Sequence, residues 1–202
     1  MRHVAVCSMF AFGILCAACS QSRSGATESG SPVASAVVAD KAFASGGTIS
    51  MQLDGGDYDV HAAADDRIRV TLNGNVGSAK VDVAASGQHA DVKVLDTPHR
   101  NFKATIEVPK AADVTVRLAA GELVLAAIAG SKDVESSAGN VTIAVGDPND
   151  YSKVDASLKA GDINADAFGE SKSGLMPHLT WSGPGTRTIR ASLGAGNLIL
   201  RK

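Results

Sequence analysis

Residues 114–125, which read VTVRLAAGELVL, contain the pattern that decides the fold of this chain. Apolar side chains alternate up to Leu118, then a small residue, a glycine and an acidic residue follow, and the alternation resumes at Leu123. Alternation with a period of two predicts β-strands that bury one face. The same pattern occurs five times, with Asp, Glu or Asn after each glycine, and its glycines are Gly56, Gly121, Gly139, Gly161 and Gly196.

The phase of the alternation changes across each of these glycines. Apolar residues stand at even positions before Gly121 and at odd positions after it. An odd number of residues must therefore be inserted if both halves are to face one core. Glycine adopts positive φ without a steric penalty, and Asp or Asn tolerates the same region. Each unit is predicted to be a strand, a bend and a second strand, so that the five glycines are structural corners.

A unit this short cannot bury its own apolar face, so neighbouring units must stack. The sequence predicts an all-β domain built as a single-stranded β-solenoid of about seven coils, with a two-sheet β-sandwich as the alternative. Three of the coils are expected in the 65 residues between Gly56 and Gly121. A further, degenerate coil is expected around residues 171–184.

The start of the chain has the features of an export signal. Arg2 precedes an apolar run over residues 4–18, which is too short to span a bilayer of about 30 Å as a helix. Residues 15–20, LCAACS, place small residues before a cysteine and resemble the lipobox of bacterial lipoproteins. The resemblance implies that residues 1–18 are a signal peptide and that Cys19 is the lipidated first residue of the mature chain. The alternative is an ordinary cleaved signal and a soluble periplasmic protein.

Residues 19–47 are rich in Ser, Gly and Ala without a sustained period, and they predict a flexible tether that joins the lipidated cysteine to a folded domain over 48–202. Ser20 after the cysteine, under the lipoprotein sorting pattern, indicates the outer membrane of a Gram-negative bacterium. The three cysteines all lie at or before Cys19, which excludes a disulfide framework in the domain. The net charge of −2 argues against a nucleic-acid partner.

The repeats are similar to a large bacterial family of extracytoplasmic β-strand-repeat domains of unknown function, often labelled adhesins. The resemblance rests on the Ala-Gly-acid/amide corners, on residues 106–109 (IEVP) before Val114, and on the closing segment 185–200, GTRTIRASLGAGNLIL. It covers about residues 48–202 and implies a "toast-rack" β-solenoid. The family has no agreed catalytic residues, so the resemblance implies none here.

The sequence contains no common catalytic signature, and its histidines never stand at a metal-ligand spacing. Asp54, Asp57 and Asp59 lack the spacing of an EF-hand, and turn chemistry explains them better. The residues after the five corner glycines are expected to lie in one row if the units are in register. Candidate carboxylates for glycan cleavage are Asp155, Asp162, Asp166 and Glu170. Trp181 is an aromatic residue that is expected either to line a binding surface or to pack against the core.

We expect no catalytic residue, no metal and no cofactor, and hence a protein that is not an enzyme. The sequence favours a lipid-anchored binding or scaffolding module of the cell envelope, whose partner is an envelope polymer or protein. One alternative is an accessory or sensor subunit of an envelope-stress system that acts through a protein partner. The other is a small carbohydrate-active enzyme.

Overall fold

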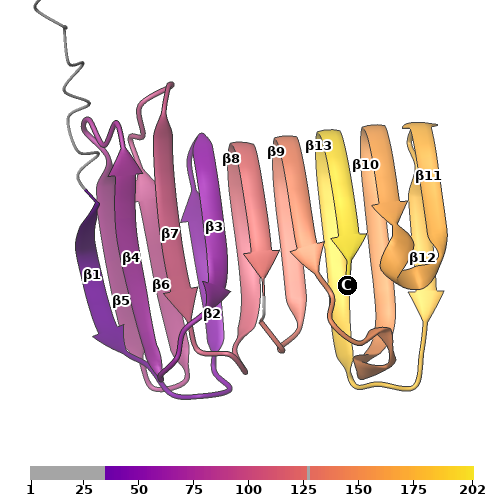
Figure 1. Ribbon diagram of the computed structural model, residues 1–202, viewed down its shortest axis with the longest axis horizontal. Coiled ribbons are helices and arrows are strands. Elements are labelled where there is room, and N and C mark those ends of the chain that lie inside the picture. The colour runs from indigo at the N-terminus through magenta and orange to yellow at the C-terminus, as the bar shows by residue number, and fades with distance from the viewer. Residues whose placement is uncertain (1–34, 127) are drawn as a thin grey trace, which may run out of the picture. The chain divides into compact units, whose positions relative to one another are not determined.

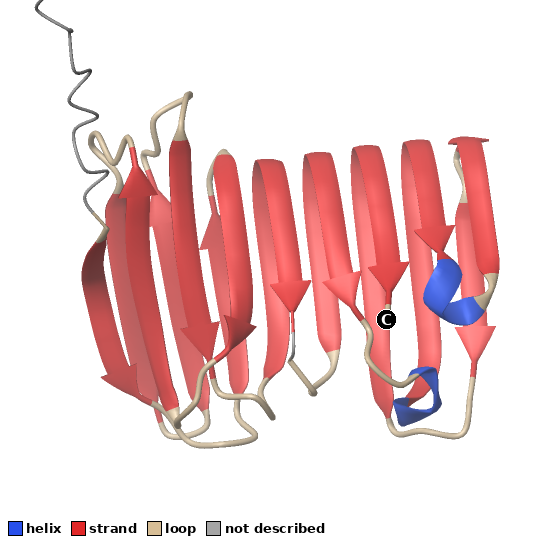
Figure 2. Ribbon diagram, viewed as in Figure 1, coloured by secondary structure: helices blue, strands red, loops and turns tan. Residues whose placement is uncertain are grey.

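The alternating apolar residues form thirteen β-strands in the computed structural model, which describes residues 35–126 and 128–202 (Figures 1 and 2). Two single-turn 3-10 helices, η1 (Pro148–Asp150) and η2 (Asp166–Phe168), flank β10. The strands are β1 (Ala36–Ala42), β2 (Thr48–Leu53), β3 (Gly56–Ala62), β4 (Arg67–Gly74), β5 (Lys80–Ser86), β6 (His89–Leu95), β7 (Phe102–Val108), β8 (Asp113–Ala126), β9 (Lys132–Ala144), β10 (Tyr151–Ala165), β11 (Glu170–Leu175), β12 (His178–Ser182) and β13 (Arg187–Arg201).

The strands form two layers that enclose the core between them. The four long strands β8, β9, β13 and β10 fold over at their glycines, so that each contributes one half to either layer (Figure 1). Layer A, as we name it, has the order β1-β4-β7-β3-β8-β9-β13-β10-β11 and contains the halves after the glycines. Layer B contains the halves before the glycines, in the order β5-β6-β2-β8-β9-β13-β10-β12. The sheet is mixed and does not close on itself.

The burial pattern confirms the predicted change of phase at the corners. In β8 the side chains of Val114, Val116 and Leu118 are buried before the glycine, and Leu123 and Leu125 are buried after it. Such side chains form one continuous apolar cluster between the layers, from Phe43 to Leu200. Each buried Val, Leu or Ile contributes about 1.5–3 kcal/mol to folding by leaving water. The all-β prediction is therefore confirmed.

The order of the units differs from the order expected for a simple solenoid. The last unit of the chain, β13, lies between β9 and β10 and pairs in parallel with both. Two units also run in the opposite direction. The β4/β5 unit lies antiparallel to β7 and β6, and the β11/β12 unit lies antiparallel to the two halves of β10. At residues 171–184, where a degenerate coil is expected, the chain thus forms a unit that runs opposite to its neighbour β10.

The stretch between Gly56 and Gly121 also differs from the prediction of about three coils. It contains β4 to β7, of which only β6 and β7 run parallel to the neighbouring unit, β2 and β3. The passage from β6 to β7 uses a loop over residues 96–101 in place of a glycine corner. A loop tolerates many sequences, so the glycine pattern is absent there.

The folded part begins earlier than residue 48. Residues 36–42, assigned above to the tether, form β1, which pairs antiparallel with β4 and carries a register shift between Val37 and Ala39. The alternation of apolar residues did not predict β1, because all but one of the β1 side chains are exposed. Residues 1–34, with the predicted signal peptide, Cys19 and the first part of the tether, lie outside the described residues.

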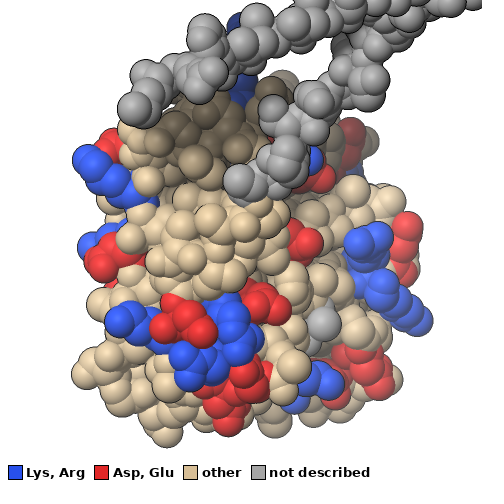
Figure 3. All heavy atoms as spheres, turned by 60° about the vertical axis from the view of Figure 1, so that its left-hand side comes forward, with Lys and Arg blue, Asp and Glu red and all other residues tan. Residues whose placement is uncertain are grey.

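Charged side chains at the β1 end are mixed in sign (Figure 3). Asp40 accepts a hydrogen bond of 2.6 Å from Nε of Arg67, and Arg69 pairs with Asp65 and with Glu107. The guanidinium of Arg67 holds the pKa of the Asp40 carboxyl below its usual range. The Asp40–Arg67 pair places charge on β1, whose outer edge pairs with no other described strand, and charge at such an edge is a common protection against edge-to-edge association.

Candidate functional site

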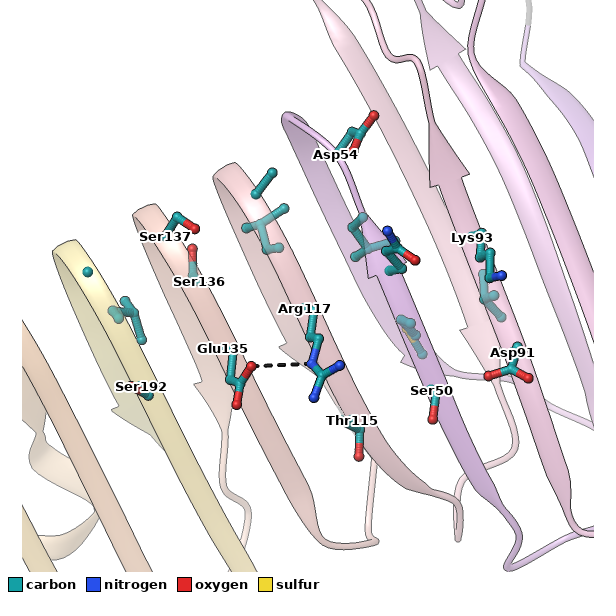
Figure 4. A pocket seen from close by; sticks show the side chains of 18 of the residues that line it. Ser50, Asp54, Asp91, Lys93, Thr115, Arg117, Glu135, Ser136, Ser137 and Ser192 are labelled. Carbon is teal, nitrogen blue, oxygen red and sulfur yellow. Dashed lines mark ion pairs between the residues drawn. The ribbon is translucent and has the colours of Figure 1, made fainter.

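Layer B carries a broad hollow on the face that points away from the core. Because side chains alternate along each strand, the residues between buried positions of six neighbouring strands all point outward there. The hollow has a volume of about 880 Å³ and extends from β6 across β2, β8, β9 and β13 to β10 (Figure 4). Its polar lining includes Ser50, Gln52, Asp54, Asp91, Lys93, Thr115, Arg117, Glu135, Ser136, Ser137, Lys159 and Ser192.

The register of the strands places these side chains in rows that run across the sheet. One row consists, from β6 to β13, of Lys93, Gln52, Arg117, Glu135 and Ser192. Successive members of a row are about 4.8 Å apart, the spacing of paired strands. A ligand that lies across the strands therefore meets a new polar side chain at each strand.

Charges of both signs line the hollow, and not all of them are paired. Nε of Arg117 lies 3.3 Å from Oε2 of Glu135, and both side chains are well exposed, at 71% and 60%. Such an exposed pair contributes less than about 1 kcal/mol to stability, so a ligand can replace it at little cost. Lys93 and Lys159 belong to none of the ion pairs among the described residues. Their ammonium groups are therefore available to a ligand.

The chemical groups that line the hollow are hydroxyls, carboxylates, an amide, ammonium groups and a guanidinium. Within the described ranges 35–126 and 128–202, no histidine and no aromatic side chain lines it. The hydroxyl of Ser136 donates to the carbonyl oxygen of Ala138 at 3.2 Å and has no adjacent base. The lining is suited to bind a polar ligand through hydroxyl, carboxylate, ammonium and guanidinium groups.

The five corner glycines lie side by side along the edge where the two layers meet. Gly56 pairs with Gly121, Gly121 with Gly139, Gly139 with Gly196, and Gly196 with Gly161. The last four have φ between 124° and 132°, a region that only glycine adopts readily. A Cβ on any of these four would lie 1.8–2.0 Å from the carbonyl oxygen of the neighbouring glycine. The close approach of the strands thus requires glycine independently of the backbone angle.

The residues after the glycines form the row that the sequence predicts for units in register: Asp57, Glu122, Asn140, Asn197 and Asp162. Nδ2 of Asn197 donates to Oδ1 of Asn140 at 2.9 Å. In the part of the chain that the structure describes, no group of three or more His, Cys, Asp or Glu side chains is arranged to hold a metal ion. The amide contact joins the corners of β9 and β13.

The candidate carboxylates for glycan cleavage are divided between two places: Asp155 lies apart from Asp162, Asp166 and Glu170, which lie around the end of β10, η2 and the start of β11. Asp155 lies on the half of β10 in layer B, and Oδ1 accepts a 3.1 Å hydrogen bond from Nε2 of His178. This bond and Lys153 hold the pKa of the Asp155 carboxyl below its usual value. Asp162 lies beyond the corner in layer A, and Asp166 begins η2. Asp155 and Asp162 thus sit on different layers rather than facing one substrate.

Trp181 packs against the end of the core. Its ring lies 4.7 Å from that of Phe168, at an interplanar angle of 48°, and both rings cover the apolar cluster where β12 ends layer B. The structure supports the packing interpretation of Trp181 over the binding one. Its indole covers a core end that no further strand closes.

A lysine inside the core is a feature that the sequence pattern did not reveal. Lys132 is 1% exposed, and Nζ donates to the carbonyl oxygen of Gly130 at 3.0 Å and to the hydroxyl of Tyr151 at 2.7 Å. The Tyr151 hydroxyl donates in turn to the carbonyl oxygen of Val145. Burial, with Arg187 nearby, lowers the pKa of Lys132 to about 8, and burial raises the pKa of Tyr151 to about 12. The pair closes the core beside η1.

Comparisons with known proteins bear on the fold. No protein-family profile matches the chain, and no curated protein matches it. Among solved structures, the chain is similar to one from Clostridium sporogenes that is described as a "putative cell adhesion protein". The match covers 84% of this chain and 99% of that one, with a TM-score of 0.53 and 10% sequence identity. At this identity the similarity concerns the fold alone, and the family resemblance drawn from the sequence stays a prediction.

The hollow was not predicted, although its residues are the polar members of each alternating strand. Arg117 and Glu135 each stand four residues before their glycines, Gly121 and Gly139. Alignment of the repeats on those glycines would have paired them. Among the described residues, no helix has the length and apolar character needed to cross a membrane. Cys19 is outside these residues.

Proposed function

We propose that this chain is a non-catalytic, lipid-anchored binding module of the bacterial cell envelope. In this proposal Cys19 carries the lipid, the following residues tether the domain to the outer membrane, and the hollow of layer B binds the partner. The parallel stacking of β8, β9, β13 and β10, in register at their glycines, supports the interpretation of this region as a β-solenoid.

The observation that carries the proposal is the hollow itself. A volume of about 880 Å³ is in the range of ligand sites, and its wall consists of strands that share one core. The lining repeats across six strands, which suits an extended polymer better than a compact small molecule. The lack of aromatic side chains among the described lining residues disfavours a neutral glycan, which usually stacks on rings. A polymer that bears charged groups fits better.

The neighbour from Clostridium sporogenes is described by its name as a protein of cell adhesion. A role in binding at a cell surface agrees with that name and with the lipobox-like residues around Cys19. Among the described residues that line the hollow there is no histidine to act as a general base, which supports a role without catalysis.

Co-sedimentation tests the proposal. The chain from residue 19 onward, with Cys19→Ser to prevent lipidation, is mixed with sacculi, outer-membrane vesicles or intact cells, and the pelleted fraction is measured against protein concentration. We expect saturable pelleting with one of these materials. The double variant Lys93→Ser/Arg117→Ser should bind at least about tenfold more weakly, because both cations line the hollow.

A matched control removes the same charge from layer A. Lys172 and Arg201 are exposed and lie outside the hollow, so Lys172→Ser/Arg201→Ser should bind as the parent does. Equal weakening by both double variants would mean that only net charge matters and would refute the hollow as the site. No pelleting with any material would overturn the proposal in favour of a sensor or accessory subunit, whose protein partner crosslinking in cells would recover.

Lipidation is tested separately. Cells that express the full chain are labelled with a fatty acid, and we expect label on the mature protein that Cys19→Ser abolishes. A mature chain that begins at residue 19 with a free thiol would instead support the soluble periplasmic alternative.

A further inference from the structure

A second, smaller cleft lies on the same face of layer B, towards the starts of the long strands. Its volume is about 230 Å³, and its wall is formed by β8, β9, β13 and β10. It shares only Thr115 with the hollow. One row across this cleft consists of Thr115, Asp133, Arg190 and Asp155.

Asp133 and Arg190 are the two charged groups of this cleft whose bonding is incomplete. Oδ1 of Asp133 is buried and accepts no hydrogen bond from any described residue. A buried acceptor without a donor is costly. Oδ2 of the same carboxylate is not among the buried atoms and has no partner among the described residues, so it is the oxygen that a ligand can reach. Arg190 lies directly beside Asp133 in the register of β13 and β9, yet it belongs to none of the ion pairs among the described residues.

The other charged groups of the cleft already have partners. Oδ1 of Asp113 accepts a hydrogen bond of 2.6 Å from the backbone N–H of Ser131. Asp155 lies 3.2 Å from Nζ of Lys153 and 3.1 Å from Nε2 of His178. The cleft therefore offers a ligand one carboxylate and one guanidinium on adjacent strands, about 4.8 Å apart along the stack.

We propose that this cleft binds the zwitterionic group of a small α-amino acid, with the ammonium on Asp133 and the carboxylate on Arg190. An α-amino acid holds its two charges on neighbouring carbons, which matches two opposite charges on neighbouring strands. Arginine binds a carboxylate through two parallel hydrogen bonds, which gives this end of the ligand a defined direction. The small volume and the charged wall favour glycine or alanine over amino acids with large apolar side chains. Binding of the zwitterion in this cleft is independent of the function proposed for the hollow; only the assignment of its source by sedimentation with sacculi rests on that function.

The test is a titration of the Cys19→Ser chain from residue 19 onward with free glycine, followed by the backbone amide signals of β9 and β13 in NMR spectra. We expect saturable shifts around Asp133 and Arg190 with a Kd of about 1 mM, as is reasonable for a ligand of five heavy atoms. Acetate and methylammonium, which each carry one of the two charges, should bind at least about tenfold more weakly.

Two variants identify the contacts. Asp133→Asn and Arg190→Gln should each weaken glycine binding at least about tenfold, which corresponds to about 1.4 kcal/mol. The matched controls Asp162→Asn and Arg201→Gln alter exposed residues of layer A and should leave the Kd unchanged. Unchanged amide spectra outside the cleft show that the variants fold. If Asp133→Asn does not fold, Arg190→Gln alone tests the proposal, because Arg190 is exposed and its replacement leaves the core intact.

The proposal is overturned if glycine gives no saturable shift up to about 50 mM, far above the expected Kd. Equal shifts with acetate alone, or full binding by Arg190→Gln, overturn it as well. The zwitterion can arrive as a free amino acid or as the end group of a polymer side chain. If glycine displaces the protein from sacculi, the group is carried on the polymer; if sedimentation is unaffected, the free amino acid is the ligand.

Discussion

The chain passes between its two layers in two different ways. In β8, β9, β13 and β10 the strand itself bends at a glycine, and the hydrogen-bonded ladder continues across the bend. Between β6 and β7 a loop over residues 96–101 makes the same passage. The loop is held by a 2.8 Å bond from the Asp96 N–H to Oδ2 of Asp54 and a 2.6 Å bond from the Thr97 hydroxyl to the Gly55 carbonyl oxygen.

The difference shows what a bent strand requires. A loop moves neighbouring backbones apart and satisfies its polar groups with side chains, so many residues are acceptable. A bent strand keeps its neighbours at ladder distance, so that the carbonyl oxygen of the next unit occupies the space of a Cβ. The glycine-cornered region should therefore be intolerant of substitution at the corner, whereas the β1–β7 region should tolerate it better.

The largest effect is expected at the corners. Gly139 has φ of 124°, and a Cβ there would lie 1.9 Å from the Gly121 carbonyl oxygen. Gly139→Ala should destabilise the domain by more than about 4 kcal/mol, because backbone strain and a steric clash act together. Gly46→Ala is the matched control, since Gly46 also has positive φ but nothing within 4 Å. It should cost about 1 kcal/mol. Denaturant midpoints measure both, and equal losses would contradict the role of close approach.

A pair of core truncations compares the two regions directly. Ile143 in β9 and Ile68 in β4 are both 0% exposed and belong to one apolar cluster. Replacement of either by alanine should cost about 3 kcal/mol through lost burial and the remaining cavity. Because the cluster is continuous, each variant should shift one common unfolding transition. Two separate transitions in calorimetry, of which each variant shifts only one, would show that the regions unfold independently.

The next largest effect on stability is expected at Lys132, a buried lysine without a counterpart among the described residues of the β1–β7 region. The fold lowers its pKa to about 8, from 10.5 in an unfolded chain, so folding disfavours the proton. The stability of the parent should therefore rise as the pH is raised from about 8 towards 10.5 and stay flat below 8. Lys132→Met should stabilise the domain by about 2 kcal/mol at pH 7.

The same comparison is made at several pH values. The advantage of Lys132→Met should shrink as the pH rises from about 8 towards 10.5, because the folded amine is neutral over this range whereas the unfolded amine still binds a proton. Above this pH the buried Tyr151, with its pKa raised to about 12, makes folding less favourable in both proteins. Thermal unfolding between pH 6 and pH 10 measures the effect, with the exposed Lys159→Met as control. A constant difference across this range would refute the assignment.

The smallest effect concerns the reversed unit at the β12 edge. Asp155 is hydrogen bonded to His178, which keeps the pKa of the Asp155 carboxyl below the ordinary value of 3.8. Asp155→Asn should cost about 0.5 kcal/mol at pH 6, as is usual for a largely exposed pair. The stabilisation by a lowered carboxyl pKa is present above the unfolded value and is lost as the pH falls through the folded one. The difference between the two proteins should therefore shrink in urea unfolding curves as the pH falls below 3.8; a persistent gap would point to a packing effect.

Part of the fold could be predicted from the sequence because it depends on local properties of each strand. The alternation around Gly121 and the change of phase from Leu118 to Leu123 follow from side-chain direction along a strand, and the structure reproduces both. The row from Asp57 to Asp162 follows from equal offsets after equal glycines. In contrast, β1 carries almost no buried side chain, and β4 to β7 lack the glycine pattern, so neither could be placed by the same argument.

The candidate site was harder to predict from the sequence than the fold. Lys93, Arg117 and Glu135 lie far apart in the sequence, and each looks like an ordinary outward residue of a strand. They meet because β6, β2, β8 and β9 are neighbours in layer B. The pair of Asp133 and Arg190 depends even more on strand order, since it exists only because β13 lies beside β9.

The sequence by itself determined that the chain forms strands, where they bend and which side chains face the core, because these depend on the period of two and on the conformations open to glycine. Only the tertiary structure decided the order of the units, the reversed direction of β4/β5 and β11/β12, and the hollow on layer B. The physical reason is that the repeated units present nearly the same apolar edge to a neighbour. Local pattern cannot rank one neighbour over another, so the choice depends on long-range contacts such as that of β13 with both β9 and β10.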